Sequence, residues 1–258
     1  MKVVILCGGR GSRLQEETIV RPKPMVTIGD YPILWHIMKI YSSFGFSDFI
    51  LCLGYKGEII KEFFKNYMWH QRDVTMNFSN GEIIFHEKSN ELNWNITFAE
   101  TGLDSMTAFR LNKVKKYLSS ENNFMLTYGD GVGDIDLIAL LDHHKKKDKI
   151  CTISGVHPPG RFGELSHEND QVISFNEKPQ AEGGFINGGF MVCNREVFKY
   201  IDDDPKTMFE GLPMQNLVKS KELNLFKHFG FWHPMDTYPE YQYLNKLWKN
   251  DQAPWKIW

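Results

Sequence analysis

The chain has 258 residues, of which 42% are hydrophobic and 24% are charged, an ordinary composition for a globular protein. Its 30 basic and 32 acidic side chains give a net charge of -2, which excludes a general electrostatic attraction to nucleic acid or to an anionic membrane. The N-terminal apolar run is too short for a signal peptide, and no later stretch approaches the roughly 20 apolar residues that span a bilayer. We therefore expect a cytoplasmic protein with no nucleic-acid or membrane partner.

Short apolar and β-branched runs alternate with helical patterns along the chain. This alternation predicts an α/β fold with a Rossmann-like, mostly parallel sheet and helices on both of its faces. No repeat or linker divides the sequence, so we expect a single domain over residues 1–258. Strands are expected at residues 2–6, 49–53, 124–127, 150–155 and 189–193, and helices at residues 32–44, 57–67, 136–147, 208–219 and 238–248.

The stretch at residues 66–105 is less regular than the rest of the chain. Residues 82–86 and 95–98 have the character of a small hairpin outside the main sheet. A small β-rich insertion of this kind forms either a lid over the strand ends or a contact between subunits, and the sequence does not decide between them.

Four cysteines (Cys7, Cys52, Cys151 and Cys193) lie far apart in apolar, strand-like runs. No C-x-x-C pair is present, so the pattern indicates neither a zinc site nor a disulfide framework. Buried free thiols are the expected state, since free cysteine is among the most buried residue types.

The strongest local signal is the glycine-rich turn at residues 8–14 (GGRGSRL), directly after the first expected strand. Its glycines let the backbone approach a ligand and direct several N–H groups at one anion. The turn lacks the ending of a P-loop, and Leu14 replaces the third glycine of the dinucleotide fingerprint. Lys23 follows between Pro22 and Pro24, which restrict its backbone. A lysine held near a glycine turn suits a phosphate contact.

A second signal is an apolar strand that ends in Asp130, between two glycines. In open parallel sheets the ligand crevice lies beyond the carboxyl ends of the strands. Asp236 also follows a strand-like run and precedes a helix. These two carboxylates suit a Mg²⁺ ion that bridges triphosphate oxygens.

The third signal is the segment at residues 175–179 (FNEKP). Glu177 in this position can bind sugar hydroxyls while Lys178 binds a phosphate. A surface ion pair is the competing interpretation. Asn187 and the segment at residues 160–163 flank it on either side.

Taken together, these segments resemble the sugar-phosphate nucleotidylyltransferase family, whose members join a sugar 1-phosphate to a nucleoside triphosphate. The family's marks are a G-G-x-G-[ST]-R-L turn, K-P dipeptides after it, a strand-end aspartate and an E-K-P segment, and all of them occur here in order. Finer matches, such as those at residues 22–26, 128–132 and 234–237, are to members that use CTP and glucose 1-phosphate.

The resemblance implies a nucleotide-diphospho-sugar transferase type of fold and a Mg²⁺-dependent, in-line attack on the α-phosphorus of CTP, which yields CDP-glucose and pyrophosphate. It also implies a homo-oligomer, with a hexamer as one form. The catalytic residues would be Arg13 and Lys23, and the metal ligands Asp130 and Asp236. By the same resemblance, the nucleotide-binding positions are Leu6, Cys7, Gly8, Gly9, Arg10, Gly11, Ser12, Arg13, Lys23, Arg110 and Thr127, and the sugar-phosphate positions are Gly163, Glu177, Lys178 and Asn187.

Three departures from the family pattern and three alternatives bear on the substrate. Cys7 stands where the family has alanine, residues 30–31 (Asp-Tyr) replace the usual small or basic residues, and Ala108 and Phe109 stand where it has two glycines before the arginine. Within the same class, the nucleotide could be UTP or dTTP, or the sugar phosphate could differ. Asp134 and Asp136 supply the D-x-D pattern of metal-dependent glycosyltransferases, and a non-catalytic regulatory module on the same fold is the third alternative.

Overall fold

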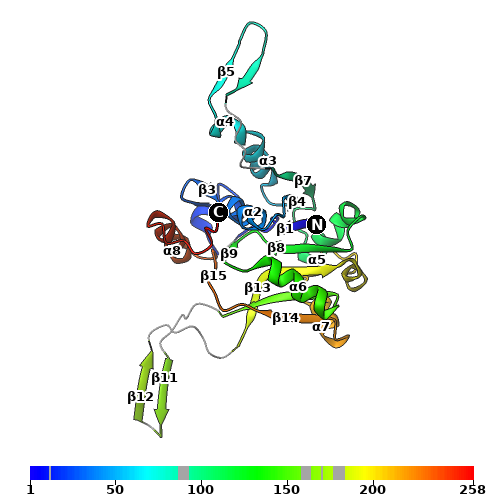
Figure 1. Cartoon of the computed structure of the whole chain (residues 1–258), viewed down its shortest axis with the longest axis vertical. Coiled ribbons are helices and arrows are strands. Elements are labelled where there is room, and N and C mark those ends of the chain that lie inside the picture. The colour runs from blue at the N-terminus through cyan, green and yellow to red at the C-terminus, as the bar shows by residue number, and fades with distance from the viewer. Residues whose placement is uncertain (12, 87–92, 158–163, 170, 177–183) are drawn as a thin grey trace.

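The protein is described by a computed structural model that covers every residue except 12, 87–92, 158–163, 170 and 177–183. Its centre is a seven-stranded sheet with the strand order β14-β10-β13-β8-β1-β4-β7 (Figure 1). The strands are β1 (Lys2–Leu6), β4 (Asp48–Leu53), β7 (Asn95–Glu100), β8 (Asn123–Tyr128), β10 (Cys151–Val156), β13 (Ile186–Asn194) and β14 (Leu223–Lys227).

The sheet is mostly parallel, which confirms the prediction. β1 runs parallel to β4 and β8, and β7 and β14 are parallel to their neighbours, whereas β13 is antiparallel to both β8 and β10. β1 is apolar and buried from Val3 to Leu6 because both of its faces are covered. Val3 and Ile5 belong to one buried core cluster, while Val4 and Leu6 belong to a second on the opposite face.

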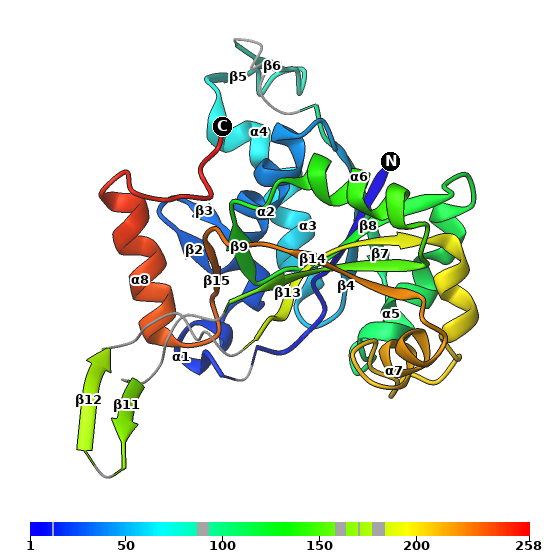
Figure 2. The same cartoon turned by 60° about the horizontal axis from the view of Figure 1, so that its bottom comes forward.

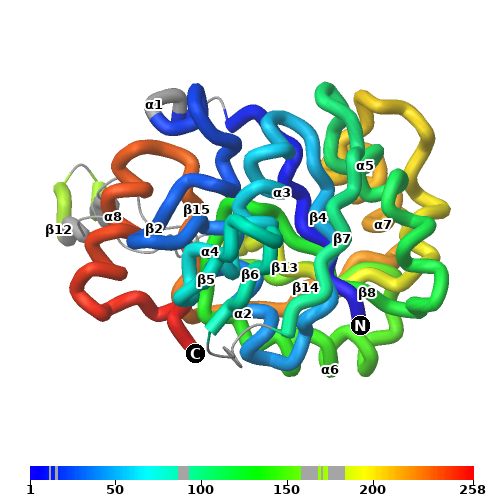
Figure 3. Tube along the Cα trace, turned by 90° about the horizontal axis from the view of Figure 1, so that it is seen from above, coloured from blue at the N-terminus to red at the C-terminus, as the bar shows by residue number. Residues whose placement is uncertain are grey.

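Helices cover both faces of the sheet (Figures 2 and 3). Apolar residues of α2 (Ile33–Ser43), α3 (Gly57–Lys65) and α6 (Leu137–Lys147) enter the first core cluster. Those of α5 (Thr107–Val114) and α7 (Leu212–Lys219) enter the second. Shorter helical elements are α1 (Gln15–Thr18), α4 (Tyr67–Gln71), η1 (Lys23–Met25), η2 (Lys115–Leu118) and η3 (Arg195–Tyr200).

The expected helix at residues 208–219 begins at Leu212 rather than at Met208. Residues before it form a turn in which the Phe209 amide donates to Thr107 Oγ1 at 2.8 Å. Gly211 and Pro213 then mark the start of the helix, since proline is tolerated in the first turn of a helix.

The hairpin expected from residues 82–86 and 95–98 is wrong in its pairing. β6 (Ile83–Phe85) pairs with β5 (Val74–Met76) instead, in a hairpin that extends beyond α4 and away from the sheet (Figure 1). β7 is an edge of the main sheet, because Ile96 and Phe98 pack against its core. A second hairpin, β11 (Glu164–Glu168) with β12 (Gln171–Asn176), projects at the opposite end of the molecule.

Two short ladders matter for the arrangement of strand ends. β2 (Thr27–Ile28) pairs with β3 (Tyr31–Pro32), and β9 (Gly131–Gly133) pairs with β15 (Trp232–Pro234). Directly beyond the β9–β15 ladder, the Met235 amide donates to the Asp130 carbonyl at 2.8 Å. The last helix, α8 (Tyr238–Lys249), starts with a capping box between Thr237 and Glu240.

The four cysteines are buried free thiols, as predicted. Within the described part of the chain, no helix has the length and apolar character needed to cross a membrane.

Candidate active site

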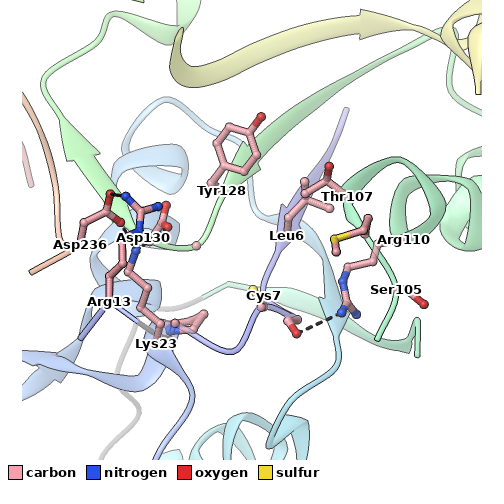
Figure 4. A pocket seen from close by; sticks show the side chains of 16 residues that line it. Leu6, Cys7, Arg13, Lys23, Ser105, Thr107, Arg110, Tyr128, Asp130 and Asp236 are labelled. Atoms are coloured by element: carbon pink, nitrogen blue, oxygen red, sulfur yellow. Dashed lines mark hydrogen bonds and ion pairs between the residues drawn. The ribbon is translucent and has the colours of Figure 1, made fainter. Parts of the chain in front are cut away.

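A pocket of about 280 Å³ opens where β1 and β8 end at their carboxyl side (Figure 4). The N-terminal end of α5 forms one wall, and the turn after β8 forms another. This is the place where open α/β sheets bind ligands. The predicted residues that line the pocket are Leu6, Cys7, Gly8, Gly9, Gly11, Arg13, Lys23, Arg110, Asp130 and Asp236.

The glycine turn approaches its neighbours so closely that a side chain would not fit at Gly8. A Cβ atom there would lie 2.2 Å from Arg110 Nη1. At Gly11 the backbone has a φ of +63°, and a Cβ would lie 2.9 Å from Lys23 Cβ. Glycine is the residue that adopts this left-handed conformation without strain. The turn is therefore packed directly against the lysine and the arginine of the site.

Lys23 lies between two carboxylates that are far apart in the sequence. Its Nζ donates to Asp130 Oδ2 at 2.8 Å and also to Asp236. Arg13 forms an ion pair with the other oxygen of Asp236 at 2.9 Å (Figure 4). The predicted cations and metal ligands thus meet in one cluster at the pocket.

The local backbone explains why Lys23 is held in place. Pro22 is extended and Lys23 begins the short helical turn η1, in which the Val26 amide donates to the Lys23 carbonyl at 3.0 Å. The side chain is only 11% exposed. Burial lowers the pKa of Lys23, but the charges and hydrogen bonds of Asp130 and Asp236 outweigh it and raise the pKa above its ordinary value. The two carboxylates therefore stabilise the charged form of Lys23.

Asp236 is positioned by the start of α8. Its amide donates to Glu240 Oε2 at 2.8 Å, and the Thr237 amide donates to the same oxygen at 2.8 Å. Asp130 is positioned from the other side by the end of β8 and the β9–β15 ladder. The start of α8 therefore positions Asp236, and the end of β8 positions Asp130.

This pair of carboxylates fits a magnesium ion. Mg²⁺ in phosphate-transfer sites is held by one or two carboxylates, with substrate phosphates and water completing its shell. No cluster of three or more His, Cys, Asp or Glu side chains occurs among the described residues. Asp130 and Asp236, which share Lys23, are the two carboxylates at the pocket that could hold a metal together with phosphate oxygens.

Arg110 lines the pocket, and its guanidinium is held by backbone carbonyls beneath the glycine turn. The side chain is buried under the glycine turn, and Nη2 donates to the Gly8 carbonyl at 3.0 Å. Nη1 donates to Thr101 Oγ1 at 2.8 Å and to the Gly102 carbonyl at 2.7 Å. Arg110 therefore braces the turn from below.

Thr127 and Arg10 do not line this pocket. The Thr127 side chain is buried, and its residue borders a smaller cavity of about 40 Å³ on the other side of Tyr128. The reason is the alternation of β8, which turns neighbouring side chains to opposite faces. Arg10 lies outside and pairs with Asp104 at 2.9 Å, where both side chains are exposed.

The predicted sugar side is described only through Asn187. Its Oδ1 accepts from the Gly189 amide at 2.8 Å, and its Nδ2 lies 3.4 Å from the Tyr128 hydroxyl. Asn187 lines the smaller cavity together with Asp130. Ser12, Gly163, Glu177 and Lys178 lie outside the described residues.

Several residues of the site were not among the predicted ones. Tyr128 borders both cavities, and its position next to the strand-end aspartate is a signal that sequence reasoning could have used. Ser105 and Thr107 line the main pocket from the start of α5. Glu210 accepts a hydrogen bond from Tyr128, and no local pattern marks it.

The D-x-D pattern is used structurally. Asp136 caps α6, because its Oδ1 accepts from the amides of Ile138 at 3.0 Å and Ala139 at 2.9 Å. Asp134 pairs with His228 Nε2 at 3.0 Å. Neither residue lines the main pocket, so the arrangement does not support a glycosyltransferase metal site.

Comparison with known proteins agrees with this geometry. A family model described as nucleotidyl transferase matches residues 2–233. Proteins named glucose-1-phosphate cytidylyltransferase from Salmonella typhi and from Salmonella typhimurium (strain LT2) are each 51% identical to this chain over 258 residues, which cover 100% of both chains. Among solved structures, HddC from Yersinia pseudotuberculosis has a TM-score of 0.68 at 25% identity and covers 96% of this chain and 99% of its own.

Proposed function

This chain belongs to the nucleotidyl transferase family, and on that premise we propose that it transfers the cytidylyl group of CTP to α-D-glucose 1-phosphate. The observation that carries the proposal is the cluster of Lys23, Arg13, Asp130 and Asp236 at the pocket. The full-length relatives named glucose-1-phosphate cytidylyltransferase support the choice of substrates. The products would be CDP-glucose and pyrophosphate.

In the proposed reaction, an oxygen of the sugar phosphate attacks the α-phosphorus of CTP in line. One P–O bond forms, the bond between the α-phosphorus and the bridging oxygen breaks, and pyrophosphate leaves with that oxygen. The attacking phosphate is already anionic, so no general base is needed. Positioning and charge stabilisation therefore supply most of the acceleration.

The glycine turn would hold the nucleotide through its backbone N–H groups. Gly8 and Gly11 let these groups come close to the triphosphate, while Arg110 keeps the turn in place from beneath. Lys23 would stabilise the charge that develops on the α-phosphate. Arg13, whose side chain is 73% exposed, extends over the pocket and would meet the β- and γ-phosphates.

Asp130 and Asp236 are the residues that would hold Mg²⁺. The metal would neutralise charge on the phosphate oxygens. Both carboxylates already pair with a cation, Lys23, and this supports the proposal that they bind positive charge at the pocket. Chelation of divalent cations is expected to abolish turnover, and added Mg²⁺ to restore it.

A homo-oligomer is also proposed, with the β5–β6 hairpin as a contact between subunits. Its tip and strands expose Met76, Phe78, Ile83, Ile84 and Phe85. The hairpin extends away from the sheet (Figure 1), which favours a subunit contact over a lid. Substitution of Phe78 and Phe85 by serine should reduce the molecular mass measured by analytical ultracentrifugation, and an unchanged mass would contradict this contact.

The test of the reaction is pyrophosphate release from glucose 1-phosphate and Mg²⁺ in parallel reactions with CTP, UTP, dTTP, ATP and GTP. Release with CTP alone is the expected result. Release with UTP or dTTP instead would keep the class of reaction and discard the cytidylyl assignment. No release with any nucleotide would point first to another sugar 1-phosphate and then to a non-catalytic module.

A further inference from the structure

Tyr128 separates the two cavities of the site. Its residue lines the main pocket beside Lys23 and Asp130, and it also lines the smaller cavity beside Asn187. In Figure 4 its ring stands between the Asp130–Asp236 side and the side formed by Leu6 and Thr107. The ring therefore lies at the border between the cavity that contains Lys23 and the smaller cavity that contains Asn187.

The ring is held against backbone on the side of β13. Gly189 has a φ of +81°, and a Cβ there would lie 2.7 Å from Tyr128 Cδ2. The neighbouring carbonyl of Gly188 accepts from Trp232 Nε1 at 2.7 Å. Packing against Gly189 thus restrains the ring of Tyr128, whereas the position of its hydroxyl depends on hydrogen bonds.

Glu210 fixes the hydroxyl. One carboxylate oxygen accepts from the Tyr128 hydroxyl, and the other accepts from Thr107 Oγ1 at 2.6 Å. Thr107 Oγ1 in turn accepts from the Phe209 amide at 2.8 Å. The carboxylate therefore ties the end of β8 to the start of α5, two elements that form opposite walls of the pocket.

The direction of these hydrogen bonds orients the tyrosine oxygen. A phenol is protonated at neutral pH, and the Tyr128 hydroxyl donates that proton to Glu210. The lone pairs of the oxygen then remain for donors on the other side, where Asn187 Nδ2 lies at 3.4 Å. A sugar hydroxyl is a donor of the same kind.

We propose that Glu210 is a positioning residue for sugar 1-phosphate binding, which acts by holding the Tyr128 hydroxyl as an acceptor beside Asn187. The inference rests on the proposed function, because it assigns the Asn187 side of the site to the sugar phosphate. It adds a specificity element that lies outside the glycine turn, the metal ligands and the Glu-Lys-Pro segment.

The test uses steady-state kinetics of Glu210→Gln, Glu210→Ala, Tyr128→Phe and the double variant Tyr128→Phe/Glu210→Ala. We expect Glu210→Ala and Tyr128→Phe to raise the KM for glucose 1-phosphate by up to about tenfold, the upper end of the effect of losing one hydrogen bond between neutral groups. The KM for CTP should change less than about twofold. Glu210→Gln, which keeps one acceptor, should lie between Glu210→Ala and the wild type.

The double variant separates a positioning role from a general loss of structure. If Glu210 acts through the Tyr128 hydroxyl, the double variant should show the same KM as either single variant. Glu196→Ala is the matched control, since this exposed glutamate pairs with Lys199 away from the pocket. Its kinetic constants should equal those of the wild type.

Two results would overturn the inference while the proposed function stands. One is an active Glu210 variant with an unchanged KM for glucose 1-phosphate. The other is an equal rise of both KM values, which would show a role in general integrity. A wild-type protein that releases no pyrophosphate with glucose 1-phosphate would instead contradict the proposed function, and the inference would fall with it.

Discussion

Lys23 illustrates how much of the site depends on one side chain. It is the only side chain in the described pocket that contacts both Asp130 and Asp236, with Arg13 reaching one of them. Like charges at close range repel strongly when they are partly shielded from water. Lys23 therefore balances the two carboxylates and also presents the charge that a phosphate would meet.

We predict that Lys23→Ala lowers kcat for pyrophosphate release by about 10²–10³-fold, because a preorganised charge on the reacting phosphate is lost. The fold should persist, as judged by an unchanged circular dichroism spectrum. Lys61→Ala is the control, since Lys61 is an exposed lysine that pairs with Glu100. Turnover of Lys23→Ala near the wild-type value would remove Lys23 from the mechanism.

At the scale of an element, the glycine turn after β1 is shaped by what lies beneath it. The Arg110 guanidinium donates to the carbonyls of Gly8 and Leu53 at 3.0 Å each. Gly54 meets the same guanidinium, because a Cβ there would lie 2.5 Å from Nη1. The turn after β1 and the turn after β4 thus both pack against the buried guanidinium of Arg110 on α5. These contacts fix the position of the glycine turn relative to the sheet.

Two glycines of the turn should differ sharply when each is replaced by alanine. Gly8→Ala places a methyl group against Arg110, so we expect the free energy of unfolding to fall by about 1–3 kcal/mol. Gly9→Ala should change it by less than about 0.5 kcal/mol, because nothing lies within 4 Å of a Cβ at Gly9. Urea denaturation measures both. Equal stability of the two variants would contradict the packing of Arg110 under Gly8.

At the scale of the whole molecule, the end of the chain closes the structure by returning to α2. Trp255 is fully buried and its Nε1 donates to His36 Nδ1 at 3.4 Å, while His36 Nε2 contacts the Ile28 carbonyl at 2.9 Å. Trp248 and Trp258 surround the same imidazole. A neutral ring with its proton on Nε2 satisfies both polar contacts. A second proton would break the contact with Trp255.

This arrangement predicts a pH dependence of stability. Burial lowers the pKa of His36 to about 4 from 6.5, so between these values the unfolded chain binds a proton that the folded chain does not. The free energy of unfolding should therefore fall as the pH decreases through this window, by about 3 kcal/mol for this residue. His36→Gln should remove that part of the pH dependence.

The measurement is urea denaturation at several pH values between 7 and 4, because other groups contribute equally to the wild type and the variant. His70→Gln serves as the control, since His70 is exposed on α4. It should keep the wild-type slope. Identical slopes for the wild type and His36→Gln would show that His36 is not the group responsible.

The sequence could predict those parts of the fold that depend on local patterns. β1 spans Lys2–Leu6 as expected, and the centres of the other predicted strands are correct, because a buried strand is an unbroken apolar run. The predicted pairing of residues 95–98 with residues 82–86 was wrong, because the strand pattern of Asn95–Glu100 (β7) does not specify a partner. The segment pairs with β4 instead, where Ile96 and Phe98 pack against the core.

By itself, the sequence determined the α/β class, the glycine turn, the restrained Lys23 and the two aspartates, because each is marked by residue type and near neighbours. Only the tertiary structure decided that Lys23 bridges Asp130 and Asp236, that Arg110 lies beneath the turn, and that Glu210 holds Tyr128. These contacts join segments that are 82 to 213 residues apart in the sequence. Their partners depend on the order of strands and the path of the connections, and no local pattern encodes that order.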